Sequence, residues 1–246
     1  MLAGLAAVLA PAWLWLVLAS LDMYADMSGA SAWMMRATWD ARYTALIFAM
    51  WSVMMLGMML PSAAPAVLIF ARVARSGPEP DRPVLRSYLF AAGYLVCWTA
   101  FSAAATALQA GLVHAALLTP MMESATPWLT AAIVLVAGVY QWSRLKRACL
   151  ERCRTPVAWI VENWRPGSLG ALRMGAAHGL YCVGCCWALM LLLFAGGVMS
   201  LWRIAALSLF VLLEKLGPFG ARGDRLVGGL LVAAAAALAL SALLHV

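Results

Sequence analysis

Cysteine side chains gather in one stretch of the chain, His178 to Trp187, which reads H-G-L-Y-C-V-G-C-C-W. Three of the six cysteines lie in it, and one of the three histidines begins it. On a helix, residues three and four apart share a face, so His178, Cys182 and Cys186 form a column with Cys185 beside it. Thiolates and an imidazole on one stripe suit Zn(II), Cu(I) or an iron–sulfur cluster. The stretch therefore predicts metal or thiol chemistry.

A second pair, Cys149 and Cys153, lies one helical turn apart in K-R-A-C-L-E-R-C-R. The basic neighbours are expected to lower the pKa values of these thiols and to favour thiolate. We favour a placement in which the helix that carries Cys182 begins near Gly179, because all five thiols then meet at one end of the bundle. If that helix begins near Ala171, the two groups separate by about 10 Å or more along its axis and form two smaller sites.

A methionine stripe forms a third candidate, in M-W-S-V-M-M-L-G-M-M-L-P. Its members, Met50, Met54, Met55, Met58 and Met59, would cover about half of a helix circumference. Thioethers bind Cu(I), but methionine is also an ordinary packing residue, and the pattern alone leaves both roles open. The P-S-A-A-P that follows predicts either a simple kink or a broken helix that lines a cavity.

The composition indicates a membrane protein. The chain is 65% hydrophobic and 11% charged, with a mean hydropathy of +0.90, whereas soluble domains are about half apolar and about a quarter charged. We expect an all-α transmembrane bundle that uses residues 1–246 as one domain. No nucleotide-binding loop, G-x-S-x-G elbow or H-E-x-x-H motif occurs, so hydrolase and ATPase functions have no support and a non-enzymatic role is favoured.

Apolar runs long enough to cross a bilayer recur along the chain. They predict seven spans, or six if the short sixth run is not one, at about 3–21, 44–70, 86–112, 128–145, 177–199, 200–216 and 226–245. No basic residue precedes the first run, so we expect a retained span rather than a cleaved signal.

The basic residues predict the orientation of the bundle. Fourteen of the seventeen lie in alternate connections, which places the N-terminus in the cytoplasm of a bacterium and the chain in its inner membrane. They form short clusters beside spans, so they indicate contact with the lipid bilayer and not with nucleic acid. The connection 146–173 is then a cytoplasmic loop, and its tryptophans and arginines indicate a possible interfacial helix. The predicted outer loops mix methionine with carboxylate, at 22–43 and at Met121, Met122 and Glu123.

Two charged residues, Glu214 and Lys215, lie at the end of a predicted span. They are adjacent and cannot face each other on a helix. Each either pairs elsewhere in the bundle or reaches the inner interface.

Four ordered segments, M-W-S-V-M-M-L-G-M-M-L-P-S-A-A-P, Y-Q-W-S-R-L-K-R-A-C-L-E-R-C-R, H-G-L-Y-C-V-G-C-C-W-A-L-M and V-L-L-E-K-L-G-P, occur over about residues 44–220. Together they resemble a bacterial family of unknown function described as predicted metal-binding integral membrane proteins. The resemblance implies a polytopic bundle with a metal site whose metal is not settled. The family-like positions are Met54, Met55, Met58, Met59, Pro61, Lys146, Cys149, Cys153, Cys182, Cys185, Cys186, Glu214 and Lys215.

These patterns favour a metal-handling membrane protein that binds, transports or delivers Cu(I), with a cuproenzyme or a metallochaperone as a possible partner. Thioethers on the outer side and thiols on the inner side would make a route of rising affinity for Cu(I). Two alternatives stay open. The cysteines could hold zinc in a structural assembly subunit, or C-x-x-C could exchange disulfides in a membrane redox protein. Iron is also a possible occupant, and the oligomeric state is open.

Overall fold

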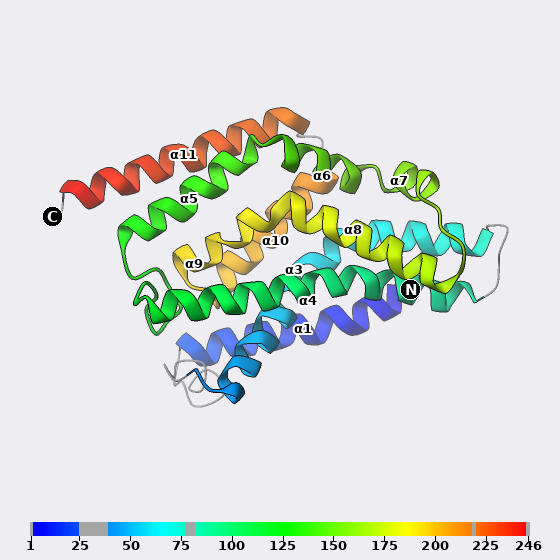
Figure 1. The fold of residues 1–246 in the computed structure, drawn as a ribbon, viewed down its shortest axis with the longest axis horizontal. Coiled ribbons are helices and arrows are strands. Elements are labelled where there is room, and N and C mark those ends of the chain that lie inside the picture. Colours follow the sequence, from blue (N-terminus) through cyan, green and yellow to red (C-terminus); the bar gives the residue numbers. More distant parts are fainter. Residues whose placement is uncertain (1, 25–38, 77–81, 218–219, 245–246) are drawn as a thin grey trace.

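The computed structural model describes residues 2–24, 39–76, 82–217 and 220–244. Apart from turns, short connections and an isolated antiparallel bridge between Leu118 and Ser124, these residues are helical, which confirms the expected all-α class. The N- and C-termini lie toward opposite ends of the molecule (Figure 1). The described helices, in chain order, are α1 (Leu2–Tyr24), α3 (Ala41–Ser76), α4 (Pro83–His114), α5 (Pro127–Gln141), α6 (Arg144–Arg154), α7 (Pro156–Glu162), α8 (Gly167–Met190), α9 (Leu192–Gly196), α10 (Leu201–Leu216) and α11 (Gly220–Leu244).

Five of the described helical segments are long and apolar enough to cross a membrane, namely Leu2–Met23, Ala41–Ser76, Pro83–His114, Gly167–Gly196 and Gly223–Leu244. The seven predicted spans are not confirmed, because two of them correspond to shorter helices. The helix α5 has 15 residues and α10 has 16. At about 1.5 Å per residue, neither reaches the ~30 Å of a hydrocarbon core.

The methionine-bearing helix α3 runs without a break through Pro61 and Pro65. Proline has no N–H to donate, so Pro61 leaves the carbonyl of Gly57, four residues earlier, without its helical partner. The indole Nε1 of Trp13 on α1 donates to this carbonyl at 3.1 Å. A side chain from the neighbouring helix therefore replaces the missing hydrogen bond, and the alternative of a broken helix is wrong.

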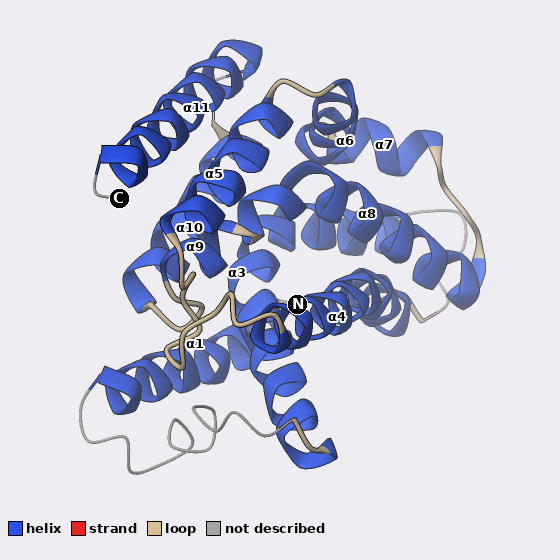
Figure 2. Cartoon of the chain, turned by 60° about the vertical axis from the view of Figure 1, so that its left-hand side comes forward, coloured by secondary structure: helices blue, strands red, loops and turns tan. Residues whose placement is uncertain are grey.

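Helices α4 and α8 lie side by side along much of their length (Figure 2). Glycines permit this close approach. A Cβ atom added at Gly93 of α4 would collide with the backbone oxygen of Leu172, and one at Gly175 of α8 would collide with that of Phe90. This contact fixes α8 against the bundle and determines which of its faces points inward.

The predicted cytoplasmic loop 146–173 is largely helical. The chain turns after Gln141, and Ser143 then caps α6, because its Oγ accepts from the backbone N of Lys146 at 3.0 Å. Helix α6 packs on α8 with a buried face at positions i, i+3, i+4 and i+7, namely Lys146, Cys149, Leu150 and Cys153. Trp159 of α7 is also buried, within a second core cluster, so the structure packs it inside the bundle.

Helix α8 begins at Gly167, ahead of the predicted start of the fifth span at residue 177 and of both alternatives near Gly179 and Ala171. The cysteine stretch therefore lies in the middle of a long apolar segment, and the favoured placement at its inner end is wrong. The signal missed in the sequence is the start of the helix after Pro166.

Candidate metal centre

Sulfur atoms are concentrated in the main hydrophobic core of the bundle. All five methionines of the stripe on α3 are buried there, and so are five of the six cysteines. Further methionines from other elements belong to the same core, namely Met23, Met122, Met190 and Met199. The core thus combines thioethers from several elements with thiols from α6 and α8.

Cys182, Cys185 and Cys186 lie on the buried face of α8, each at most 1% exposed. The thiols of Cys185 and Cys186 donate to the carbonyl oxygen of Cys182 at 3.1 Å and 3.0 Å. The Cys186 Sγ also lies 3.9 Å from the Sδ of Met59 on α3. A thiol of α8 and a thioether of α3 are therefore in contact.

Cys153 of α6 joins this group through a hydrogen bond with the thiol of Cys185. The two cysteine groups meet although α8 starts early, because α6 folds back from the end of α5 and lies along α8. The alternative of two separated sites is therefore wrong for Cys153. We call Cys153, Cys182, Cys185, Cys186 and Met59 the sulfur cluster.

Cys149 lies one turn before Cys153, against Gly184 of α8. A Cβ atom at Gly184 would come within 2.7 Å of the Cys149 Sγ, so glycine is needed for this contact. The Oη of Tyr140 also donates to the carbonyl of Gly184 and helps to hold α5 on α8. Cys149 is thus a neighbour of the sulfur cluster, on its α6 side.

The thiols of α6 do not show the expected lowering of their pKa values. Burial raises the pKa of Cys149. The hydrogen bond with Cys185, followed by burial, raises the pKa of Cys153 well above its usual value. The expectation of thiolates promoted by basic neighbours is therefore wrong, because the buried face of α6 turns these thiols away from most of its arginines.

The charged pair at the end of α10 lies inside the bundle, and both side chains are 5% exposed. Both carboxylate oxygens of Glu214 accept from the Nζ of Lys146 at 2.7 Å. The Nζ of Lys215 lies 2.9 Å from the Cys182 Sγ and 2.9 Å from the Ser62 Oγ. The alternative in which each residue pairs elsewhere in the bundle is therefore correct.

Tyr94 of α4 is a second polar neighbour of the cluster that the sequence did not single out. Its Oη donates to the carbonyl of Met59 at 3.1 Å and lies 2.9 Å from the Cys182 Sγ. Because the phenol has one proton, a hydroxyl that donates to Met59 accepts from the Cys182 thiol. Tyr94 and Ser62 could have been found as polar residues inside predicted spans, where such groups are costly.

Among the described residues, no hydrogen bond joins His178 to the sulfur cluster. Its ring lies among aromatic rings, with centroid distances of 5.4 Å to Trp159 and 6.1 Å to both Phe90 and Tyr94. Its Nδ1 has no hydrogen-bond partner within the described part of the chain. As expected from the helical column, it lies one turn from Cys182; its role as a ligand is an untested prediction from the sequence, which the metal site proposed below does not use.

The other methionines of the stripe, Met50, Met54, Met55 and Met58, are buried in the same core. Among the described residues, Met59 alone of the stripe contacts a cysteine sulfur through a hydrogen bond. The described residues also contain no group of three or more His, Cys, Asp or Glu side chains already arranged around a metal position. Binding by the sulfur cluster therefore requires its side chains to turn from their present hydrogen bonds toward a common point.

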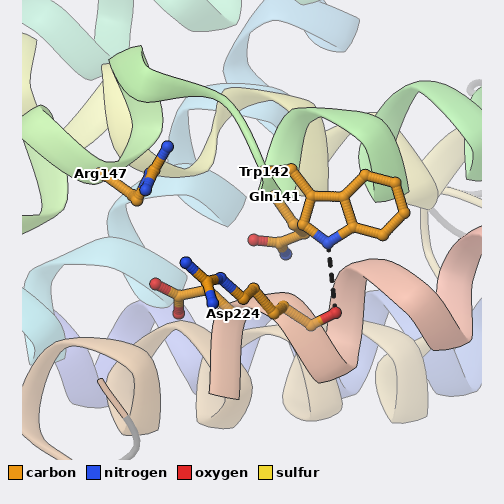
Figure 3. Close-up of a pocket in the computed structure, with 5 residues that line it drawn as sticks. Gln141, Trp142, Arg147 and Asp224 are labelled. Atoms are coloured by element: carbon orange, nitrogen blue, oxygen red, sulfur yellow. Dashed lines mark hydrogen bonds between the residues drawn. The ribbon is translucent and has the colours of Figure 1, made fainter. Parts of the chain in front are cut away.

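A polar pocket of about 380 Å³ lies on the other side of α6. It is lined by Gln141, Trp142, Arg147, Asp224 and Arg225, and the Trp142 Nε1 donates to the carbonyl of Arg225 at 3.2 Å (Figure 3). An adjoining pocket of about 310 Å³ shares Arg147 and Asp224 and also contacts α6. These pockets hold no sulfur ligand among their lining residues, so they are separate from the sulfur cluster.

The fold and the core together define a class, an apolar helical bundle of the membrane-protein type with a buried, sulfur-rich centre. The profile of a copper-chaperone family, PpoB2, matches residues 48–238, and the chain belongs to this family. No curated protein and no solved structure matches the chain. The match supports the metal-related character that the sequence resemblance implied and is consistent with copper, but it does not support the family of unknown function itself. The zinc and redox alternatives are not favoured.

Proposed function

We propose that the protein binds Cu(I) at the sulfur cluster within the membrane and passes it on to a partner. The observation that supports this most directly is the meeting of Cys153, Cys182, Cys185, Cys186 and Met59 in the core of an apolar bundle. Thiolate and thioether sulfur are the ligands that select Cu(I). Membership of a copper-chaperone family supports copper as the cargo.

The buried methionines would give this centre its supply route. Met50, Met54 and Met58 lie on α3 ahead of Met59, and Met23 and Met122 from other elements share their core. Met27, Met34 and Met35, which the sequence places in an outer loop, lie outside the described residues. In the proposed orientation, the N-terminus is cytoplasmic and Cu(I) moves from weaker thioethers toward stronger thiolates.

Delivery would involve α6. Its buried face carries Cys149 and Cys153, while its other side carries basic residues beside the polar pockets. An acceptor with its own thiols could take Cu(I) from Cys153 by ligand exchange, in which each new Cu–S bond forms as an old one breaks. We propose a cuproenzyme or a metallochaperone as this acceptor, and the bacterial inner membrane as the location.

Replacement of both Met54 and Met58 by leucine is expected to lower cellular copper accumulation about fivefold, the factor for ~1 kcal/mol of lost binding. Leucine keeps the buried volume but cannot bind Cu(I). The measurement is copper per cell, with the amount of membrane-inserted protein determined in parallel. Met174→Leu is the matched control, because this buried methionine belongs to the second core cluster. Unchanged accumulation at equal protein levels would exclude the methionine route.

A further inference from the structure

Lys215 places a cationic side chain beside the sulfur cluster. The residue is 5% exposed, and its Nζ lies between the Sγ of Cys182 and the Oγ of Ser62, at 2.9 Å from each. An ammonium group in such a buried position is costly unless an opposite charge compensates for it. Lys215 therefore needs a negatively charged neighbour.

Carboxylates do not supply this negative charge within the described part of the chain, because none forms an ion pair with Lys215. The adjacent Glu214 is held by Lys146 through both of its oxygens. Its backbone carbonyl also accepts from the Nε of Arg154 at 2.7 Å. The Lys146–Glu214 pair is therefore balanced by itself, and among the described residues the Nζ of Lys215 contacts a thiol and a hydroxyl group.

We propose that Lys215 is the counter-cation of the metal–thiolate complex and that it makes the centre selective for a monovalent soft ion. This inference rests on the proposed function and specifies its charge. When two cysteine thiols bind Cu(I), two S–H bonds break, two Cu–S bonds form and two protons leave to solvent. The resulting complex has a charge of −1, which the single ammonium group balances.

The same balance disfavours a divalent ion. Two thiolates around a soft divalent ion make a neutral complex, and the Lys215 charge then stays uncompensated in a buried site. The Nζ lies only 2.9 Å from a ligand sulfur, and little water lies between the charges. The difference in electrostatic energy between the monovalent and the divalent complex is therefore large. The lysine thus adds selection by charge to the selection by softness that sulfur already provides.

Silver and cadmium separate these two kinds of selection, because both ions are soft but Ag(I) is monovalent and Cd(II) is divalent. In detergent-purified protein, Ag(I) is expected to displace Cu(I), whereas Cd(II) should bind about a hundredfold more weakly than Ag(I) when each is corrected for its affinity for a free dithiol. Cd(II) binding as tight as that of Ag(I) would overturn the inference, and a site with three thiolates would give that result. This arm needs no variant.

Substitution of the lysine provides the second arm. Lys215→Leu removes the charge without adding a sulfur ligand, and Lys215→Arg keeps the charge. Lys215→Leu is expected to weaken Cu(I) binding about thirtyfold, measured by competition with a chromophoric Cu(I) chelator, while Lys215→Arg stays within about threefold of the unaltered protein. Equal Cu(I) affinity in Lys215→Leu and the unaltered protein would contradict the proposed role.

A double-mutant cycle with Cys182→Ser tests whether Lys215 acts through its sulfur neighbour. If it does, Lys215→Leu should have little further effect once Cys182 is serine, so the two losses are not additive. Additive losses would assign Lys215 a general role in folding. If the unaltered protein binds neither Cu(I) nor Ag(I), the proposed function itself fails, an outcome distinct from a failure of charge selection alone.

Discussion

A triple variant, Cys182→Ser with Cys185→Ser and Cys186→Ser, is expected to bind Cu(I) roughly a hundredfold or more weakly than the unaltered protein. Serine has nearly the same shape but offers a hard hydroxyl oxygen in place of a soft thiolate. The three side chains are buried on one face of α8, so their replacement removes every thiol that this helix offers to the metal. Copper per chain, measured by elemental analysis of purified protein, gives the result directly.

The sixth cysteine supplies the control for this variant. Cys97 lies outside the core cluster, is half-buried, and donates its thiol to the carbonyl of Ala176 at 3.1 Å. Serine can keep that hydrogen bond, so Cys97→Ser should bind copper as the unaltered protein does. If the triple variant retains its copper, or if Cys97→Ser loses as much as the triple variant, the sulfur cluster is not the binding site.

Lys146→Met is expected to lower the free energy of unfolding of the copper-free protein by about 3–5 kcal/mol. The Lys146 side chain is fully buried, and its Nζ holds both oxygens of Glu214 at 2.7 Å. Without the lysine, the carboxylate of Glu214 stays in an apolar core with no cation to balance it. The shift can be measured by denaturant unfolding in detergent micelles, followed by helical circular dichroism.

An exposed ion pair between α6 and α7 provides the comparison. Arg152 lies 3.2 Å from Glu162, and their side chains are 47% and 62% exposed. Arg152→Met should therefore cost about 0–1 kcal/mol, since solvent screens such pairs. Replacing both Lys146 and Glu214 by apolar residues should restore most of the stability that Lys146→Met loses. A loss in Lys146→Met no larger than in Arg152→Met would contradict the role of the buried pair.

The chemistry of this protein could be predicted from the sequence more reliably than its geometry. The spacing of the residues indicated that Cys182, Cys185 and Cys186 lie on one face of a helix. It also indicated that the methionines of α3 lie along a second helix, because helical spacing is a local property. The predicted position of the cysteines along their helix was wrong. The start of α8 at Gly167 lies within a polar stretch that composition assigns to a loop.

The seven predicted spans are not confirmed, for a related reason. Hydropathy does not distinguish a helix that faces lipid from one that packs inside a bundle, and α5 and α10 are too short to cross the bilayer alone. The contacts of Lys215 and Tyr94 with Cys182 could not be predicted either. They depend on how α4, α8 and α10 come together in space, which no local pattern in the sequence specifies.

X-ray absorption at the copper edge of the purified, Cu(I)-loaded protein tests the central claim most directly. The account predicts about one copper per chain, in the monovalent state, with sulfur as the only type of atom in its first coordination shell. Two cysteine thiolates of the sulfur cluster, together with Met59, would supply those atoms. A first shell that contains nitrogen or oxygen, or a protein that takes up no copper, would contradict it.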